Sequence, residues 1–424
     1  MEPKILALIL FVLMYVVMIA RPKWRVYAAL AVAAIYLFCG ILPLGKVLGA
    51  INWNVLMMMG GTMVVVYYFI ESQMPAKLAE VLLDHSKNVM WVTIWMSLFA
   101  GLISAFIDNV ATVVMVAPVG LAICKKLKIN PVPMILAIAV SSNLQGAATL
   151  VGDTTSILLG AYANMDFLDF FWMNGRPGIF FAVELGALAT VPVMMFLFRK
   201  ERAQVKAPHT AEVKDVIPAL FLVAVVVLLI AASFIPGKPD LTNGFICLGL
   251  AFASIVYDFA KNYDKKRIRE AVKSVDYETL VLLTGLFLVI QGITEVGVVD
   301  DLAGLIVSAG GKNLFVLYTV IVWGSVAVSA FVDNIPYVAT MLPVLTKVTS
   351  LMGISPYLLF FGLLSGATLG GNLTPIGASA NIAGVGLLRK EGYEVSFRDF
   401  MRIGVPFTLV AVATAYVYLW IFWR

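Results

Sequence analysis

The sequence predicts an all-α polytopic membrane protein made of two inverted-topology repeats, each with a re-entrant helical hairpin and a broken transmembrane helix. The first observation is composition: 61% of the 424 residues are hydrophobic, 13% are charged, and the mean hydropathy is +0.96. Soluble domains have roughly 45–50% apolar and about 25% charged residues. This chain therefore needs the bilayer as its solvent, which excludes a soluble enzyme, a nucleic-acid-binding protein and a disordered scaffold. The other observations are the spacing of apolar segments and an internal duplication.

A helix needs about 20 apolar residues to cross ~30 Å of hydrocarbon. Two broken segments, described below, each add one crossing, so we expect about ten. With the turn at 21–25 inside, most of the 30 Lys and Arg residues also fall inside, as the positive-inside rule requires. We therefore expect a multi-pass protein of the cell membrane, the inner membrane in a bacterium, with both termini outside. The unbroken apolar segments are 5–20, 26–43, 55–70, 178–198, 216–235, 244–257, 279–293 and 404–422.

Four regions depart from simple spans, and function is expected there. Residues 89–126 and 314–348 each hold two apolar arms around a polar centre, which predicts a re-entrant hairpin. Each hairpin is followed by a long segment, 131–163 or 356–388, that is interrupted by Gly, Asn, Thr and Asp or Pro. Unwound backbone at membrane depth is stable only where protein or a water-filled cavity satisfies its polar groups.

The chain contains one pattern twice. SAFIDNVATVVMVAPV at 104–119 matches SAFVDNIPYVATMLPV at 329–344, and the same register aligns helix-breaking Gly and Pro residues further on. Each copy crosses the membrane three times, so the copies should be oppositely oriented. Inverted repeats whose broken helices meet near the midplane are typical of secondary transporters. The predicted divisions are N-terminal spans at 1–50, repeat 1 at 52–198, cytoplasmic loops and a linker hairpin at 199–275, and inverted repeat 2 at 276–422.

The hairpin tips carry the charged residues of the duplicated motif, Asp108 with Asn109 and Asp333 with Asn334. An aspartate at the bilayer centre costs about 2.5–3.5 kcal/mol on insertion scales, so water, a cation, a proton or a helix N-terminus must compensate it. One interpretation is structural, with each Asp capping the second arm of its hairpin. The duplication favours a site built from both copies, and an Asp can cap and bind at once.

The broken segments supply polar groups that suit ions. Glycine lets the backbone unwind, freed carbonyl groups suit Na⁺, and half-helix N-termini favour an anion. The alternative is that small residues only permit close helix packing. The candidate ion- or substrate-binding residues of hairpins and breaks are Asp108, Asn109, Thr112, Asn143, Thr149, Asp153, Thr154, Thr155, Asp333, Asn334, Asn372, Thr374, Ser379 and Asn381.

Asp153 breaks the symmetry of the copies, because its counterpart is Ala378. An unpaired carboxylate in the membrane is a candidate carrier of a proton or cation; the alternative is a turn cap. With Asp108 it gives the first copy two carboxylates, against Asp333 alone in the second. We therefore expect ion coupling to depend more on the first copy, with this pair exchanging a proton for Na⁺.

No catalytic motif accompanies these residues. The chain lacks GxxxxGK[ST], so ATP hydrolysis is not expected, and its three cysteines give neither a disulfide framework nor a metal site. We expect a protein that is not an enzyme, without cofactors except Na⁺ as a candidate. Its partners are a small inorganic ion or anion and membrane lipid, not nucleic acid. A soluble ATPase partner stays open.

The motifs SAFxDN, GxATLxGD and GGNxTxIGASAN, followed by EGYxxSFxxF at 391–400, resemble the ion-transporter superfamily over nearly the whole chain from about residue 50. The branch they resemble most holds arsenite permeases, sodium/proton antiporters and the P protein; the divalent-anion/sodium symporters are more distant. This resemblance implies a scaffold domain, a mobile transport domain, elevator-like alternating access and a homodimer. One departure is that the branch commonly has GDPPN where this chain has GDTTS at 152–156.

The resemblance to the symporters also implies two Na⁺ sites, each made by a hairpin tip and a break. The implied groupings are Asn109 and Thr112 with Gly146 and Thr149, and Asn334 with Gly371 and Thr374.

Together these observations predict a secondary active transporter of arsenite-permease or Na⁺/H⁺ antiporter type. It would move a small inorganic ion, an oxyanion or a carboxylate, coupled to H⁺ or Na⁺. The alternative is an ion channel that uses the same broken-helix pore. An intramembrane aspartyl protease fits less well, because the dipeptides Gly152-Asp153 and Tyr257-Asp258 stand in the wrong order for that class.

Overall fold

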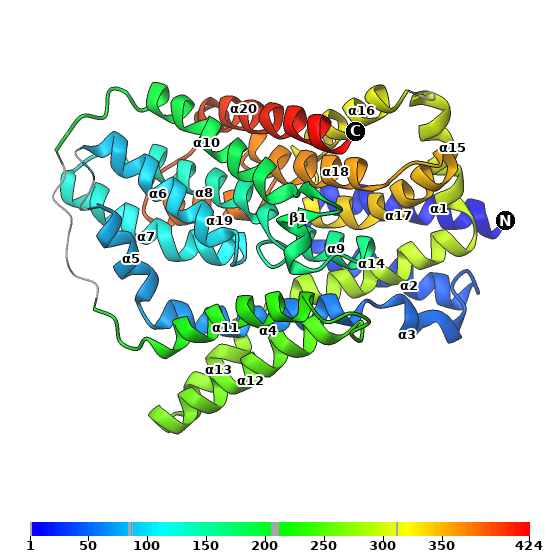
Figure 1. Ribbon diagram of the computed structural model, residues 1–424, viewed down its shortest axis with the longest axis horizontal. Helices are drawn as coiled ribbons and strands as arrows, with labels where there is room; N and C mark the ends of the chain where they lie inside the picture. The colour runs from blue at the N-terminus through cyan, green and yellow to red at the C-terminus, as the bar shows by residue number, and fades with distance from the viewer. Residues whose placement is uncertain (1, 84–85, 87, 205–211, 311–312) are drawn as a thin grey trace.

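Figure 1 shows the computed structural model of the protein, which is nearly all helical. The structure describes the chain apart from residues 1, 84–85, 87, 205–211 and 311–312. The α-helices of the described part are α1 (Pro3–Ala20), α2 (Arg25–Phe38), α3 (Val47–Ala50), α4 (Trp53–Glu71), α5 (Met74–Leu83), α6 (Val89–Ser104), α7 (Asn109–Leu127), α8 (Val132–Gln145), α9 (Thr154–Ala163), α10 (Ile179–Leu197), α11 (Ile217–Ser233), α12 (Thr242–Asn262), α13 (Lys265–Lys273), α14 (Tyr277–Glu295), α15 (Val298–Gly310), α16 (Leu314–Ser329), α17 (Asn334–Met352), α18 (Tyr357–Gly370), α19 (Ser379–Lys390) and α20 (Phe397–Trp423). Shorter elements are the 3-10 helices η1 (Pro22–Trp24), η2 (Leu44–Lys46), η3 (Gly146–Ala148), η4 (Phe167–Phe170) and η5 (Gly371–Leu373), and the strands β1 (Trp172–Met173) and β2 (Arg176–Pro177).

Eight of the described helices are long and apolar enough to cross a membrane: α1, α4, α7, α10, α12, α14, α17 and α20. Large apolar side chains cover much of the outer surface, and only 17% of the apolar window of α1 is buried in the protein. Exposed apolar surface of this extent is stable in lipid rather than in water. The prediction of an all-α, multi-pass membrane protein is confirmed.

The helices fall into two packed groups. In the first, α12 packs along α4 and α2 packs along α14. The second holds the two hairpins, the two breaks, and α10 with α20, which lie side by side along the top of Figure 1. Within it α6 packs on α8 as α16 packs on α18, while α9 contacts α17 and α19 contacts α7. Each break therefore touches the hairpin of the other copy.

Close glycine contacts join the first group in the same way in both copies. A Cβ added to Gly61 of α4 would lie 2.5 Å from the Cys247 backbone in α12. One added to Gly285 of α14 would lie 3.0 Å from the Ala29 side chain in α2. The helix pair α1–α2 therefore packs on α14 in the same way that the pair α11–α12 packs on α4.

The two copies run in opposite directions, as predicted. A Cβ on Gly60 would lie 3.8 Å from Leu280, and the Asp276 N–H donates to Met63 Sδ at 3.3 Å, so the equivalent helices α4 and α14 are antiparallel. Asn88 and Asn313 start the two hairpins by accepting hydrogen bonds from the first turns of α6 and α16. Such caps satisfy donors that a helix start leaves unpaired. The tip of each hairpin lies against a break in the protein interior: Thr149 bonds the carbonyl of Ala105, and Thr374 bonds that of Ala330.

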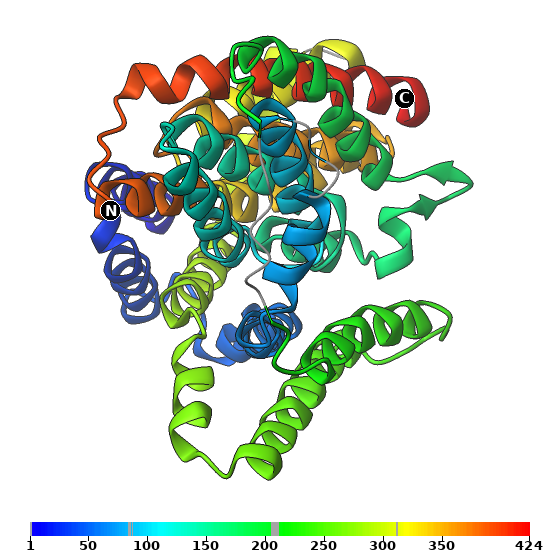
Figure 2. The ribbon, with the colours of Figure 1, turned by 90° about the vertical axis from the view of Figure 1, so that its left-hand side faces the viewer.

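Two peripheral elements leave the helical body. Figure 2 shows the end of α12 and α13 projecting below the rest. Asp258 near the end of α12 is buried and pairs with Arg267 of α13 at 2.9 Å, so its carboxylate holds α13 against α12. The strands β1 and β2 form a small antiparallel hairpin through Asn174 and Gly175, both with positive φ, as a tight two-residue turn requires.

Candidate functional site

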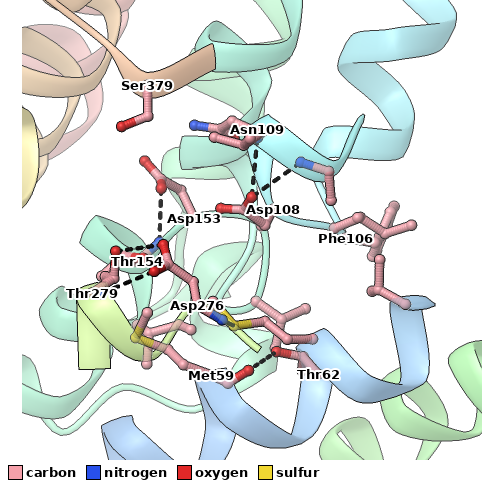
Figure 3. Close-up of a pocket in the computed structure, with 18 of the residues that line it drawn as sticks. Met59, Thr62, Phe106, Asp108, Asn109, Asp153, Thr154, Asp276, Thr279 and Ser379 are labelled. Atoms are coloured by element: carbon pink, nitrogen blue, oxygen red, sulfur yellow. Dashed lines mark hydrogen bonds between the residues drawn. The ribbon is translucent and has the colours of Figure 1, made fainter. Parts of the chain in front are cut away.

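A cavity of about 340 Å³ lies between the two helix groups. Its walls come from the second half of α4, the tip of the first hairpin, the break before α9 and the start of α14. Figure 3 shows Asp108 and Asp153 near each other in this cavity, with Asp276 on the α14 side and Ser379 across from Asp153. The tip and the break of the first copy thus form most of the polar wall.

The first hairpin tip is held by hydrogen bonds to its own helix and to the break. Asp108 Oδ1 accepts from the backbone N–H groups of Val110 and Ala111 at 3.0 and 3.2 Å, so it caps α7. Asn109 donates to Asn143 Oδ1 at 3.2 Å. A Cβ on Gly146 would lie 2.2 Å from Asn109 Oδ1, so glycine lets the tip touch the break.

Three threonines implied in the Na⁺ sites do two different things. Thr149 donates to the carbonyl of Ala105, and Thr374 donates to the equivalent carbonyl of Ala330, so both tie a break to its hairpin tip. Thr112 is fully buried and its hydroxyl has no hydrogen-bond partner among the described residues. Buried polar groups are nearly always paired, so this hydroxyl is an exception, and it lies outside the lining of the cavity.

Asp153 caps a helix and also reaches the other copy. Its Oδ1 accepts from the Thr154 N–H at 2.8 Å, and its Oδ2 accepts from the Thr155 hydroxyl at 2.9 Å. The Asn334 amide lies 3.4 Å from the same Oδ2. Only 5% of Asp153 is exposed. The cap predicted as the alternative role is therefore present, and the second hairpin tip meets the carboxylate as well.

A network of amides joins the broken helices where they cross. Asn143 donates to Asn372 Oδ1 at 3.0 Å and to the Thr368 carbonyl at 2.7 Å, while Asn372 donates to the Val140 carbonyl at 2.8 Å. Asn381 spans its own break by donating to the Thr374 carbonyl at 3.2 Å. These bonds fix the relative position of the two breaks in the protein interior.

The second hairpin tip is paired differently from the first. Asp333 caps α17 through the Ile335 N–H at 3.2 Å, and its Oδ2 accepts from Arg25 Nη1 at 2.8 Å. Asn334 contacts Asp153 of the other copy, whereas the atoms nearest to a Cβ on Gly371 belong to its own break. In the first implied Na⁺ grouping, Asn109 of the tip thus contacts Gly146 of its own break. In the second, Asn334 of the tip contacts Asp153 of the first copy instead.

The predicted residues divide into those that line the cavity and those that hold the framework around it. Seven line the cavity: Asp108, Asn109, Asn143, Asp153, Thr154, Asn334 and Ser379. The others are Thr112, Thr149, Thr155, Asp333, Asn372, Thr374 and Asn381.

The far wall of the cavity was not predicted. Thr62 of α4 and Asp276 with Thr279 at the start of α14 line it. Asp276 accepts from the Thr279 N–H at 3.0 Å and from its hydroxyl at 2.6 Å, so it caps α14. An Asp three residues before a Thr at the start of an apolar run is a helix-start signal, but nothing in that pattern places it opposite the first hairpin.

The cavity has acidic and electropositive ends. Three carboxylates and no Lys, Arg or His occur among its lining residues. The starts of α7, α9 and α17 are already capped by Asp108, Asp153 and Asp333, whereas α19 has Ala378 at its N-cap position and no side-chain cap. An uncapped helix start attracts anions. Among the described residues no cluster of three His, Cys, Asp or Glu could hold a metal ion, so cation binding here needs neutral oxygens as well.

Comparison with known proteins gives one consistent result. Residues 13–360 match the model of a family described as citrate transporter. An uncharacterized transporter of Mycobacterium tuberculosis is 32% identical over 382 residues, which cover 88% of this chain and 86% of that protein. The P protein of Mus musculus is 26% identical over 92% of this chain and 56% of its own length. These matches confirm the resemblance seen in the motifs.

A solved structure shows the same fold. The YdaH transporter of Alcanivorax borkumensis, described as having an unusual topology, superposes with a TM-score of 0.62, covering 99% of this chain and 98% of that one. Its sequence identity to this chain is 15%, so the likeness concerns the fold alone.

Proposed function

The chain belongs to the citrate transporter family and is a membrane transporter, and we propose that it is a secondary active transporter coupled to H⁺ or Na⁺. Its substrate is a small inorganic ion, an oxyanion or a carboxylate. The group of hairpins and breaks moves against the group of α2, α4, α12 and α14 in an elevator-like cycle, and two chains assemble as a homodimer.

The observation that carries this proposal is the charge of the cavity. Asp108, Asp153 and Asp276 line it without a basic side chain among the lining residues. Charges taken out of water must be paired, so an anion enters only when a cation or protons neutralise the carboxylates. Binding of the anion and binding of the cation then favour each other, and this mutual dependence is a coupling free energy.

The two copies supply different halves of the site. Asp108 and Asp153 hold the proton or Na⁺. Asn109, which lies against Gly146, and the unpaired hydroxyl of Thr112 supply neutral oxygens. The uncapped start of α19, with Ser379 at its first position, faces the anion. Hard cations prefer oxygen ligands of this kind, and helix starts stabilise negative charge.

The position of the cavity supports movement of one group against the other. The carboxylate pair and Ser379 belong to the hairpin-and-break group, whereas Thr62, Asp276 and Thr279 belong to the facing group. The amide network of Asn143 and Asn372 keeps the first set together. A bound ion would therefore travel with the hairpins while the α4–α14 wall stays behind.

The test is flux into proteoliposomes under imposed pH and Na⁺ gradients, with a panel of anions that includes citrate. We expect at least one gradient to drive uptake of an anion or exchange of an ion, with thermal stability of the purified protein rising in the same ions. Current far above carrier turnover under voltage alone would instead show a channel. Flux that no gradient can drive uphill would contradict the proposal. Light scattering in mild detergent tests the homodimer.

A further inference from the structure

We infer that Arg25 is a resident counter-cation for the second hairpin tip, so that Asp333 takes no cation from solution in this conformation and ion binding falls to the first tip. The inference rests on the proposed function and deepens it. It names which of two equivalent aspartates binds the coupling ion. The evidence is the contact between Arg25 and Asp333, which has no equivalent at Asp108 among the described residues.

The contact joins three charges from three elements. Arg25 Nη1 donates to Asp333 Oδ2 at 2.8 Å, and Arg25 Nε donates to Glu278 Oε1 at 3.0 Å. Arg25 starts α2 and Glu278 lies in the first turn of α14, so both belong to the group that packs against the hairpins. The guanidinium is thus held on one group while it pairs with the hairpin tip of the other.

The pair is partly withdrawn from water. The side chain of Arg25 is 22% exposed and that of Asp333 23%, against 55% for Glu278. A guanidinium is always charged and forms directed bonds to carboxylates. It therefore supplies, in fixed position, the positive charge that an aspartate at a hairpin tip otherwise needs from a cation or proton.

The first tip has no such partner. Asp108 caps α7 as Asp333 caps α17, yet among the described residues it makes no ion pair, and the neighbouring carboxylates Asp153 and Asp276 line the same cavity. Asp108 therefore remains to be neutralised by an ion from solution. The second tip is neutralised by the chain itself for as long as Arg25 stays in place.

An effect of ions on thermal stability could arise at Asp333 or at the charged and titratable groups near it. Arg25 from α2 contacts Asp333 itself, and Glu278 from α14 contacts Arg25. Asp153 from the break before α9 contacts the neighbouring Asn334, and Tyr15 from α1 donates to the Pro336 carbonyl. Variants at Arg25, Asp333 and Glu278 separate their contributions.

The experiment measures thermal stability of the full-length protein against NaCl, with choline chloride as the balancing salt, and over a pH series. Each bound ion adds to the slope of stability against the logarithm of ion concentration. We expect Arg25→Gln to about double the slope that wild type shows for its ion, because Asp333 then takes up a second one. Arg25→Lys, which keeps the charge, and Glu278→Gln, which keeps the Arg25–Asp333 pair, should both have the wild-type slope.

Two further variants decide the assignment. Adding Asp333→Asn to Arg25→Gln should return the slope to the wild-type value, and Asp333→Asn alone should leave it unchanged. If Arg25→Gln folds only when the ion is present, this would also support the inference, because the variant then depends on the ion for stability more than the wild type does. An unchanged slope in folded Arg25→Gln, or loss of ion dependence in Asp333→Asn alone, would overturn the inference. Absence of any ion dependence in wild type, together with absence of coupled flux, would instead overturn the proposed function.

Discussion

The break before α9 and the break before α19 share their backbone contacts and differ in charge. A Cβ on Gly152 would lie 2.6 Å from the Gly146 carbonyl and 2.7 Å from that of Ala105. A Cβ on Gly377 would lie 2.6 Å from the equivalent Gly371 carbonyl and 2.7 Å from that of Ser329. Yet the first break carries a carboxylate at its helix start and the second carries none.

This difference shows how a duplicated fold can become an asymmetric site. Close packing fixes the glycines, because any side chain there meets carbonyl oxygens in both copies. The residue at the helix start differs between the copies. Asp153 places a carboxylate at one helix start, whereas Ala378 leaves the other start without a side-chain cap. The framework stays symmetric while the charges it presents to the cavity diverge.

The largest expected effect tests the shared framework. Gly152→Ala and Gly377→Ala should each lower the free energy of unfolding by about 1–3 kcal/mol, because the added carbon overlaps backbone oxygens that cannot move independently. Thermal melting and the fraction of monodisperse protein in detergent measure this. Similar losses in both variants would support equal packing of the breaks. A loss in one alone would mean that the copies are not equivalent there.

Next comes the charge that differs between the breaks. Asp153→Asn should reduce ion-coupled flux by about tenfold or more, because a neutral amide no longer carries a proton or Na⁺. Folding should persist, since Asn is also a good helix cap. Proteoliposome flux under pH and Na⁺ gradients is the measurement, with Thr155→Val as a control that removes one hydrogen bond to Asp153 but keeps the charge. If flux through Asp153→Asn keeps the pH and Na⁺ dependence of the wild type, the role of Asp153 is only to cap α9.

A smaller effect separates the hairpin tips. Asp108→Asn should weaken cation binding by several-fold or more, and Asp333→Asn should change it by less than about twofold, because Arg25 already neutralises Asp333. Both variants keep a capping side chain, so helix starts are matched. Titration of thermal stability with the coupling ion gives the two affinities. If the two substitutions weaken cation binding equally, Asp108 and Asp333 contribute equally and the two tips are not functionally different.

The smallest expected effect concerns the electropositive break. Ser379→Ala removes one hydroxyl but leaves the uncapped backbone N–H groups of α19, so anion affinity should fall by about two- to tenfold, the range of one hydrogen bond. Competition by the transported anion in the flux assay measures it. Ala378→Asp is the converse variant, which would cap α19 and should suppress anion binding further. If neither Ser379→Ala nor Ala378→Asp changes the anion affinity, the anion binds away from the start of α19.

The sequence alone determined the class of fold and the positions where function lies. Apolar segments of bilayer length, interrupted twice in the same register, leave few architectures, because unwound backbone in a membrane must meet other protein or water. The duplicated Asp-Asn tips and glycine-rich breaks follow from that register. Asp153 could be recognised as the exception, because its partner position holds Ala378.

Only the tertiary structure decided which of these residues meet. Asn334 contacts Asp153 of the other copy, Asp276 faces the first hairpin tip across the cavity, and Arg25 pairs with Asp333. Each contact joins residues more than a hundred positions apart, on elements whose relative depth depends on how the two helix groups are set against each other. Local pattern fixes where a chain bends and which side chains it offers there; the packing of one group on the other fixes which charges are left for an ion to neutralise.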